Sequence, residues 1–193
     1  MLERETQYPE QRHKGCDDMR TRGRSKRLAA DGVQIYSIGH SDHTIEGFLE
    51  LLHRNGIALL VDVRSQPYSR WVPQFNREKL ARELEAVGVH YVFMGDSLGG
   101  RPASAGSGDD DQEAPDYQQL AQGEPFKAGI EQLLELAAAQ RVAMMCAEGD
   151  YHRCHRSKLI TPALLEHGAR VFHILPGGGF AEAQPEPRQL TLL

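Results

Sequence analysis

The segment from Val142 to Lys158, VAMMCAEGDYHRCHRSK, concentrates side chains that can carry out chemistry. An apolar run ends in Cys146-Ala147-Glu148, and after a short polar loop Cys154-His155-Arg156 opens a helix-like stretch. Packing alone does not require thiols, imidazoles, a carboxylate and guanidinium groups so close together. Loops that join a strand to a helix are where open α/β sheets bind ligands. The segment therefore predicts a functional site.

The residue types in this segment indicate nucleophilic or acid/base chemistry. A thiol beside Arg156 and His155 is shifted toward the thiolate, which is its reactive form. Cys146 is therefore the candidate nucleophile, and Glu148 and His155 are candidate acid/base groups. Arg156 lies near a helix N-terminus, where backbone N–H groups already favour an anion. The alternative is that Cys146 is a small buried residue with no chemical role.

The elements that must position this segment follow from the alternation of apolar patterns along the chain. Strands are predicted at 33–38, 57–63, 89–93, 141–145 and 170–175, and helices at 44–55, 76–87, 125–140 and 155–167. Asn76 is expected to cap the second helix, and Pro162 to kink the last one. Strands separated by helices predict an α/β fold with three α/β/α layers and a mostly parallel sheet of about five strands.

Polar residues follow each predicted strand, and the carboxyl ends of parallel strands share one edge of a sheet. We therefore expect one pocket, in which Asp62 joins Cys146, Glu148 and His155 as a catalytic residue. The candidate substrate-binding residues are His40, Arg64, Ser69, Arg70, Gly99, Gly100, Arg101, Cys154 and Arg156. Guanidinium groups suit phosphate or carboxylate ligands. The alternative is structural: Asp62 caps the turn after its strand, and Arg64 only pairs with it.

The same segment contains five residues that could bind a metal ion. Its possible ligands are Cys146, Glu148, His152, Cys154 and His155. Their spacing matches no standard zinc pattern, such as two Cys-x-x-Cys pairs. We therefore predict no cofactor, and we do not favour a metal at the cluster of Cys146, Cys154 and His155.

Length and composition predict one domain with irregular ends. The chain has 193 residues, of which residues 1–31 are expected to form a disordered polar leader, 32–176 the α/β domain and 177–193 a flexible tail. The net charge of −5 argues against coating of nucleic acid by bulk electrostatics, although it allows a local basic site. Three cysteines are an odd number, so reduced thiols are expected rather than a disulfide framework.

The expected compartment is the cytoplasm, with no membrane partner. No apolar run approaches the roughly 18 residues that a membrane-crossing helix needs. The charged N-terminus does not resemble a secretory signal. The sequence does not give the oligomeric state.

Five motifs in order resemble the domain of unknown function 488 family. They are SIGHS (37–41), LVDVRSQPYSR (60–70), PQF (73–75), YVFMGDSLGGR (91–101) and MCAEGDYHRCHRS (145–157). The resemblance places the candidate residues at family positions: His40, Asp62, Arg64, Ser69, Arg70, Gly99, Gly100, Cys146, Glu148, Cys154, His155 and Arg156. It strengthens the prediction of the site and implies no particular reaction.

A looser resemblance concerns rhodanese-type sulfurtransferases. In both, Asp-x-Arg closes an early strand and a later Cys opens an anion-binding loop. The segment from Cys146 to Ser157 is several residues longer than such a loop, and position 152 is His where cysteine phosphatases have Arg. The likeness is therefore an analogy that implies sulfur or thiol chemistry at Cys146.

The C-terminal residues Gln189, Leu190, Thr191, Leu192 and Leu193 resemble the short peptide with which bacterial repair proteins dock on the sliding clamp. Gln189 would be the polar anchor and the leucines would fill a groove. Leu193 stands where the usual peptide has Phe, and such a short apolar peptide can also arise by chance.

Three functions follow as hypotheses. The first is a hydrolase or transferase that acts on a phosphate-bearing substrate, such as a nucleotide or nucleic acid. The second is rhodanese-like sulfur chemistry at Cys146. The third is a non-enzymatic module that binds nucleotide or nucleic acid and is recruited to the sliding clamp, with a possible association with DNA repair.

Overall fold

The computed structural model of the chain describes residues 32–101 and 115–185. The predicted leader (1–31), with Cys16, and the predicted clamp-binding residues 189–193 lie outside the described residues. Within the described part of the chain, no helix is long and apolar enough to cross a membrane.

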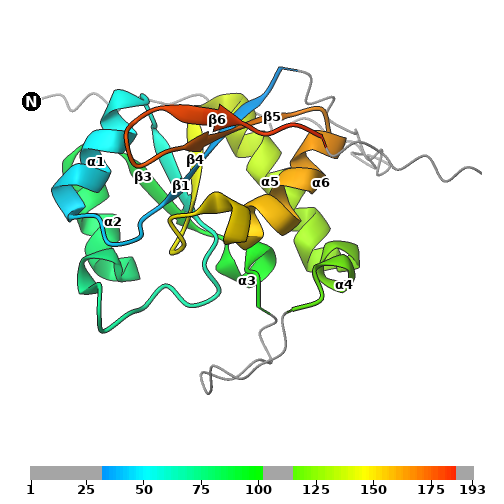
Figure 1. Cartoon of the computed structure of the whole chain (residues 1–193), viewed down its shortest axis with the longest axis horizontal. Helices are drawn as coiled ribbons and strands as arrows, with labels where there is room; N and C mark the ends of the chain where they lie inside the picture. The colour runs from blue at the N-terminus through cyan, green and yellow to red at the C-terminus, as the bar shows by residue number, and fades with distance from the viewer. Residues whose placement is uncertain (1–31, 102–114, 186–193) are drawn as a thin grey trace, which may run out of the picture.

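A six-stranded sheet forms the centre of the fold (Figure 1). Its order is β3-β2-β4-β1-β5-β6, and every neighbouring pair is parallel except β5 with β6. The strands are β1 (Gln34–Gly39), β2 (Leu59–Asp62), β3 (His90–Phe93), β4 (Val142–Cys146), β5 (Arg170–Ile174) and β6 (Phe180–Glu182). The predicted α/β fold with a mostly parallel sheet is confirmed.

Helices cover both faces of the sheet (Figure 1). On one face lie α1 (Ile45–Arg54) and α2 (Arg77–Ala86), and on the other lie α5 (Glu124–Ala139) and α6 (Thr161–Glu166). The shorter elements are α3 (Gly95–Leu98), α4 (Tyr117–Gln122), the 3-10 turns η1 (Pro73–Phe75) and η2 (Tyr151–Arg153), and the π-helical turn η3 (Arg156–Ile160). The sequence analysis did not predict α3 and α4.

Side-chain alternation along the strands divides the core into two clusters. In β2, Val61 belongs to the cluster that contains Leu133 of α5, whereas Leu60 belongs to the cluster that contains Phe48 of α1. The same alternation decides which face of the sheet a polar residue at the end of a strand can reach.

The prediction that Asn76 caps α2 is wrong in its detail. Asn76 is the residue before the helix, but its side chain accepts no hydrogen bond from the first turn. Its Oδ1 instead accepts from the backbone N–H of Ser69 at 2.7 Å. The side chain therefore stabilises the loop that precedes the helix, since this hydrogen bond joins Ser69 of the loop to the residue at the helix start.

The last predicted helix is two elements rather than one kinked helix. The π-helical turn η3 comes first, and Pro162 lies in the first turn of α6. Ile160 and Thr161 at the junction both have helical backbone angles, so η3 runs directly into α6, and Pro162 supplies no N–H donor to this continuous stretch. The hydroxyl of Thr161 donates to the carbonyl of Arg156 at 2.7 Å, which stabilises the junction.

Residues 180–182, which the sequence analysis placed in the flexible tail, form β6. Gly178 has a φ of +85°, a conformation that favours glycine, and it lets the chain reverse after β5. Phe180 then packs edge-on against Tyr36 and Phe172, at ring-centroid distances of 6.2 and 6.0 Å. The glycine-rich sequence before β6 does not predict a strand. The aromatic contacts that stabilise β6 come from distant strands, so no local pattern indicates them.

Candidate active site

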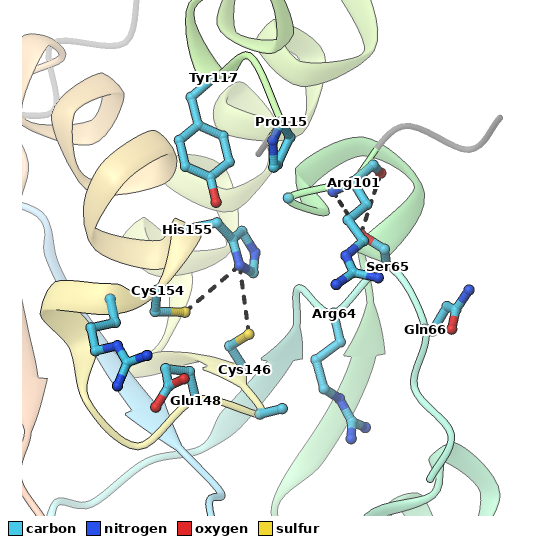
Figure 2. Close-up of a pocket in the computed structure, with 13 residues that line it drawn as sticks. Arg64, Ser65, Gln66, Arg101, Pro115, Tyr117, Cys146, Glu148, Cys154 and His155 are labelled. Carbon is cyan, nitrogen blue, oxygen red and sulfur yellow. Dashed lines mark hydrogen bonds between the residues drawn. The ribbon is translucent and has the colours of Figure 1, made fainter. Parts of the chain in front are cut away.

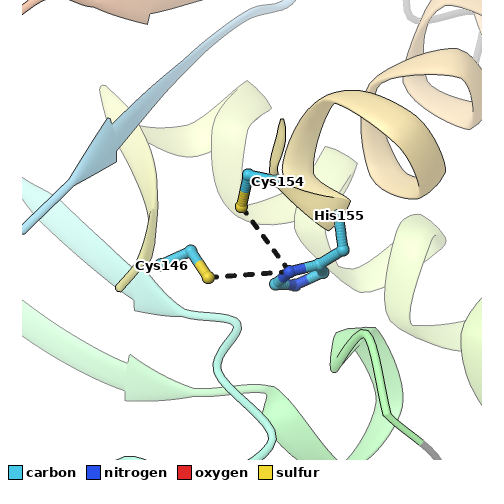
Figure 3. A group of neighbouring side chains, drawn as sticks. All are labelled: Cys146, Cys154 and His155. Carbon is cyan, nitrogen blue, oxygen red and sulfur yellow. Dashed lines mark hydrogen bonds between the residues drawn. The ribbon is translucent and has the colours of Figure 1, made fainter. Parts of the chain in front are cut away.

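Cys146, Cys154 and His155 form the centre of the site (Figure 3). Cys146 ends β4, and Cys154 and His155 lie between η2 and η3. The Nδ1 atom of His155 lies 3.6 Å from Cys146 Sγ and 3.7 Å from Cys154 Sγ. Both cysteines are free, and all three side chains are buried. The loop after β4 thus folds back so that its far end meets its own strand.

A hydrogen bond at Nε2, the ring nitrogen that faces away from the sulfurs, sets the orientation of the His155 ring. Its Nε2 lies 3.1 Å from the carbonyl oxygen of Val63. A carbonyl oxygen can only accept, so Nε2 carries the hydrogen of the neutral ring and Nδ1 presents its lone pair to both sulfurs. Gly100 makes room for this arrangement, because a Cβ atom there would lie 2.7 Å from Cβ and Cγ of His155.

Arg156 contacts the sulfur of Cys154 from the interior. Its Nε and backbone N–H donate to Cys154 Sγ at 3.2 and 3.5 Å. The guanidinium also donates to Ser37 Oγ at 3.2 Å and to the carbonyl of Glu148 at 2.6 Å. Arg156 is 1% exposed, so protein groups rather than solvent or substrate surround it.

These contacts separate the pKa values of the two thiols. The hydrogen bond from Cys146 lowers the pKa of Cys154, with further lowering by the Arg156 guanidinium, although burial acts in the opposite direction. The same hydrogen bond and burial raise the pKa of Cys146. These directions favour Cys154 over Cys146 as the thiolate of the pair, and the nucleophilic role of Cys146 stays a prediction.

A pocket of about 420 Å³ opens beside the two thiols (Figure 2). Glu148 and Arg153 are exposed at its wall. Ser65 fixes the backbone of Arg101, since its Oγ accepts from the Arg101 N–H at 3.1 Å and donates to the Arg101 carbonyl at 3.3 Å. The pocket therefore combines sulfur and imidazole in its buried part with charged groups nearer to solvent.

A second polar cluster occupies the opposite face of the same sheet edge. Asp62 accepts from Arg64 at both carboxylate oxygens, with distances of 2.9 Å from Nε and 2.6 Å from Nη2, and from the Tyr91 hydroxyl at 2.7 Å. Arg64 Nη2 also donates to the carbonyl of Phe75 at 2.8 Å. Burial, followed by Asp62, raises the pKa of Tyr91. Asp62 is fully buried and lines no part of the pocket, which agrees with the structural alternative.

His40 belongs to this second cluster. Its Nδ1–H donates to the carbonyl of Ser41 at 3.0 Å, and its Nε2 accepts from Arg64 Nη1 at 3.2 Å. The ring stacks on Phe75 at a centroid distance of 4.4 Å. Burial lowers the pKa of His40 to about 4, so the ring is neutral at pH 7. Its ring nitrogens are occupied by protein groups.

The structure thus divides the predicted single pocket. The predicted residues that line it are Arg64, Gly100, Arg101, Cys146, Glu148, Cys154 and His155, and those outside its lining are His40, Asp62, Ser69, Arg70, Gly99 and Arg156. Arg64 contributes to the wall, but its guanidinium turns away from the thiols (Figure 2) and pairs with Asp62. Of the four predicted arginines Arg64, Arg70, Arg101 and Arg156, only Arg101 lines the pocket without a carboxylate partner among the described residues.

Two predicted residues in the β2–α2 loop have local contacts instead. Ser69 Oγ accepts from the backbone N–H groups of Trp71 and Val72 at 3.1 and 3.4 Å. The Arg70 guanidinium lies 5.0 Å from the centre of the exposed Trp71 ring. Gly99 serves packing, because a Cβ there would lie 2.3 Å from the carbonyl of Gly95.

The sequence analysis missed several residues around the site. Arg153, Ser65 and Tyr117 line the pocket. Ser37 links Arg156 to His173, whose Nδ1 lies 2.7 Å from Ser37 Oγ. Burial lowers the pKa of His173 to about 4. A polar residue inside an otherwise apolar strand was the available signal for Ser37 and His173, whereas nothing in the sequence marked Tyr117.

Comparison with known proteins adds one match. A family model described as "Domain of unknown function DUF488" matches residues 44–161. The match includes four of the five motifs and every residue of the thiol cluster, while SIGHS (37–41) precedes it. Searches of curated proteins and of solved structures found no match.

Proposed function

The chain belongs to the DUF488 family, whose description names no reaction, and from that premise we propose that it is a hydrolase or transferase acting on a phosphate-bearing substrate. The observation that supports this proposal is the composition of the 420 Å³ pocket, in which two free thiols and an imidazole lie below exposed cationic side chains. A concave site with a few convergent polar groups is typical of substrate binding.

Arg101 and Arg153 are the anion-binding residues in this proposal. Both are exposed pocket residues, and no carboxylate of the described residues lies within 4.0 Å of either guanidinium. Arg64 and Arg156, by contrast, have protein acceptors for their guanidinium groups. A guanidinium with free N–H groups can bind phosphate oxygens with two parallel hydrogen bonds.

Glu148 is the acid/base residue of the proposal. Its carboxylate is exposed in the pocket, where it can exchange a proton with a substrate. His155 is less suited to that role, because its Nε2 is bound to the Val63 carbonyl and its Nδ1 faces the sulfurs. We propose that His155, Cys146 and Cys154 form the chemical centre, which is the group of side chains nearest to the reacting atoms.

Binding of phosphate-bearing probes tests the proposal. Inorganic phosphate and a panel of nucleoside monophosphates are titrated into the purified full chain by calorimetry. Arg101→Ala and Arg153→Ala should each weaken binding by about tenfold to a hundredfold, since a hydrogen bond to a charged group contributes about 1.5–3 kcal/mol. Arg82→Ala is the matched control, because Arg82 is exposed on α2. Failure of every probe to bind, or equal binding by all variants, would overturn the proposal.

A second candidate function is sulfur transfer. The observation that favours it is the pair of N–H groups from Arg156 that point at Cys154 Sγ. In this reaction the Cys154 thiolate attacks the outer sulfur of thiosulfate, the S–S bond of thiosulfate breaks, and sulfite leaves with the electron pair. Mass spectrometry should then find one added sulfur on the peptide that contains Cys154. No added sulfur with thiosulfate or other donors would refute this candidate.

A further inference from the structure

We propose that Cys146, Cys154 and His155 bind a zinc ion whose fourth coordination position opens into the pocket. The inference rests on the proposed function and deepens it, because it identifies the three residues of the chemical centre as ligands of a metal ion. The Sγ atoms of both cysteines and the ring nitrogen of His155 all lie within 4.8 Å of one another (Figure 3). Thiolate and imidazole ligands are those that zinc prefers.

The two distances between sulfur and nitrogen fit tetrahedral coordination of one ion. Zinc lies about 2.3 Å from a cysteine sulfur and about 2.0–2.1 Å from a histidine nitrogen, so tetrahedral angles place the two donor atoms about 3.6 Å apart. The observed separations from His155 Nδ1 are 3.6 Å to Cys146 Sγ and 3.7 Å to Cys154 Sγ. The single lone pair of His155 Nδ1 can accept a full hydrogen bond from only one thiol, whereas one metal ion would bind all three ligand atoms.

The surrounding hydrogen bonds also fit a metal site. A histidine that binds a metal usually donates its other N–H to a carboxylate or a backbone carbonyl. His155 does so through Nε2, 3.1 Å from the carbonyl of Val63. Cys154 Sγ accepts two N–H groups from Arg156, which stabilise a thiolate ligand. Hydrogen bonds with protein groups therefore hold both His155 and Cys154 on the side of the cluster that faces the interior.

The charge of the buried region indicates an anionic fourth ligand. Arg156 is 1% exposed, and among the described residues no carboxylate lies within 4.0 Å of it. A divalent ion, two thiolates and Arg156 together carry one positive charge. An anion at the fourth position, such as hydroxide or a phosphate oxygen, would neutralise that charge, and the open side of the cluster is the pocket that holds Arg101 and Glu148.

Zinc was not expected from the sequence, because the ligand spacing matches no structural zinc motif. That criterion applies to closed sites with four protein ligands. A catalytic zinc needs three protein ligands and one open position, and the third ligand here is the neighbour of the second in the chain. Zinc would lower the pKa of a bound water to about 7. Glu148 would take the proton of that water as the water oxygen bonds to the substrate phosphorus. The bond from phosphorus to the leaving oxygen would break, and Glu148 would return the proton to that oxygen.

Metal analysis of the full chain tests the site. The protein is equilibrated with zinc, desalted and measured by elemental mass spectrometry, and about one zinc per chain is expected. Cys146→Ser, Cys154→Ser and His155→Gln should each weaken zinc binding by at least about tenfold, as even second-sphere changes cost about 10–100-fold. The matched control His152→Gln should retain the ion, because His152 is exposed and is not one of the three clustered residues.

Cobalt substitution keeps the test valid where a variant fails to fold. Wild-type protein loaded with cobalt should show a thiolate-to-cobalt charge-transfer band and the intense visible bands of a tetrahedral ion. Absence of these bands together with zinc far below one per chain would overturn the zinc site. Phosphate binding that still depends on Arg101 in the same preparation would leave the proposed substrate class intact, so the two failures can be told apart.

Discussion

Replacement of Asp62 tests whether this carboxylate serves the fold or the chemistry. Asp62 is fully buried, and it accepts hydrogen bonds from Arg64 and Tyr91. Asp62→Ala removes these acceptors and leaves the Arg64 guanidinium, 5% exposed, without its anionic partner. Removing one partner of a buried ion pair costs about 3–5 kcal/mol, since the remaining charge is neither solvated nor paired.

The loss can be converted into a denaturation midpoint. With an m-value of about 2 kcal/mol per molar urea, Asp62→Ala should lower the midpoint by about 1.5–2.5 M. The double variant Asp62→Leu/Arg64→Met should lower it by much less, because an apolar pair leaves no buried charge. Glu85→Ala, an exposed change on α2, should shift stability by no more than about 0.5 kcal/mol.

Urea unfolding followed by circular dichroism measures these shifts, and turnover or ligand binding is measured on the same samples under native conditions. The structural role predicts reduced stability with ligand binding retained in Asp62→Ala. A midpoint within about 0.5 M of the wild-type value, combined with loss of turnover, would refute our reasoning. That result would instead support the predicted catalytic role of Asp62.

Three further predictions concern His40, Gly100 and the C-terminal peptide. Burial lowers the folded pKa of His40 to about 4, below its ordinary value of 6.5, so its contribution of up to about 3 kcal/mol is present above pH 6.5 and is lost as pH falls toward 4. His40→Gln should reduce the change of the urea midpoint over this range without abolishing it, because the pKa of His173 is lowered to about 4 as well. An unchanged profile would contradict this. Gly100→Ala should displace the His155 ring and weaken zinc binding by at least about tenfold, while Gly177→Ala, whose Cβ meets nothing within 4 Å, should not. Deletion of residues 189–193 should abolish recovery of the chain in a pull-down with a purified bacterial sliding clamp, and equal recovery would exclude the predicted docking.

The sequence identified the layers of the fold because periodicity is a local property. Five strands and the main helices follow from apolar patterns within windows of a few residues. β6 escaped prediction because it is three residues long and is stabilised by the distant rings of Tyr36 and Phe172. The π-helical turn before α6 escaped prediction because apolar periodicity does not distinguish it from an α-helix.

For the site, the sequence by itself determined which loops carry reactive residues and that these loops share the carboxyl edge of the sheet. Only the tertiary structure decided which residues meet. Asp62 lies in register with Met145, so Cys146, the next residue of β4, points to the opposite face of the sheet. Asp62 and Arg64 therefore joined His40 on the α1–α2 face, and Cys146 joined Cys154 and His155 on the other. Loop packing, including the close approach of Gly100 to His155, then brought Cys146 and His155, nine positions apart in the chain, to a distance of 3.6 Å. Such contacts depend on distances between elements that no local pattern of residues encodes.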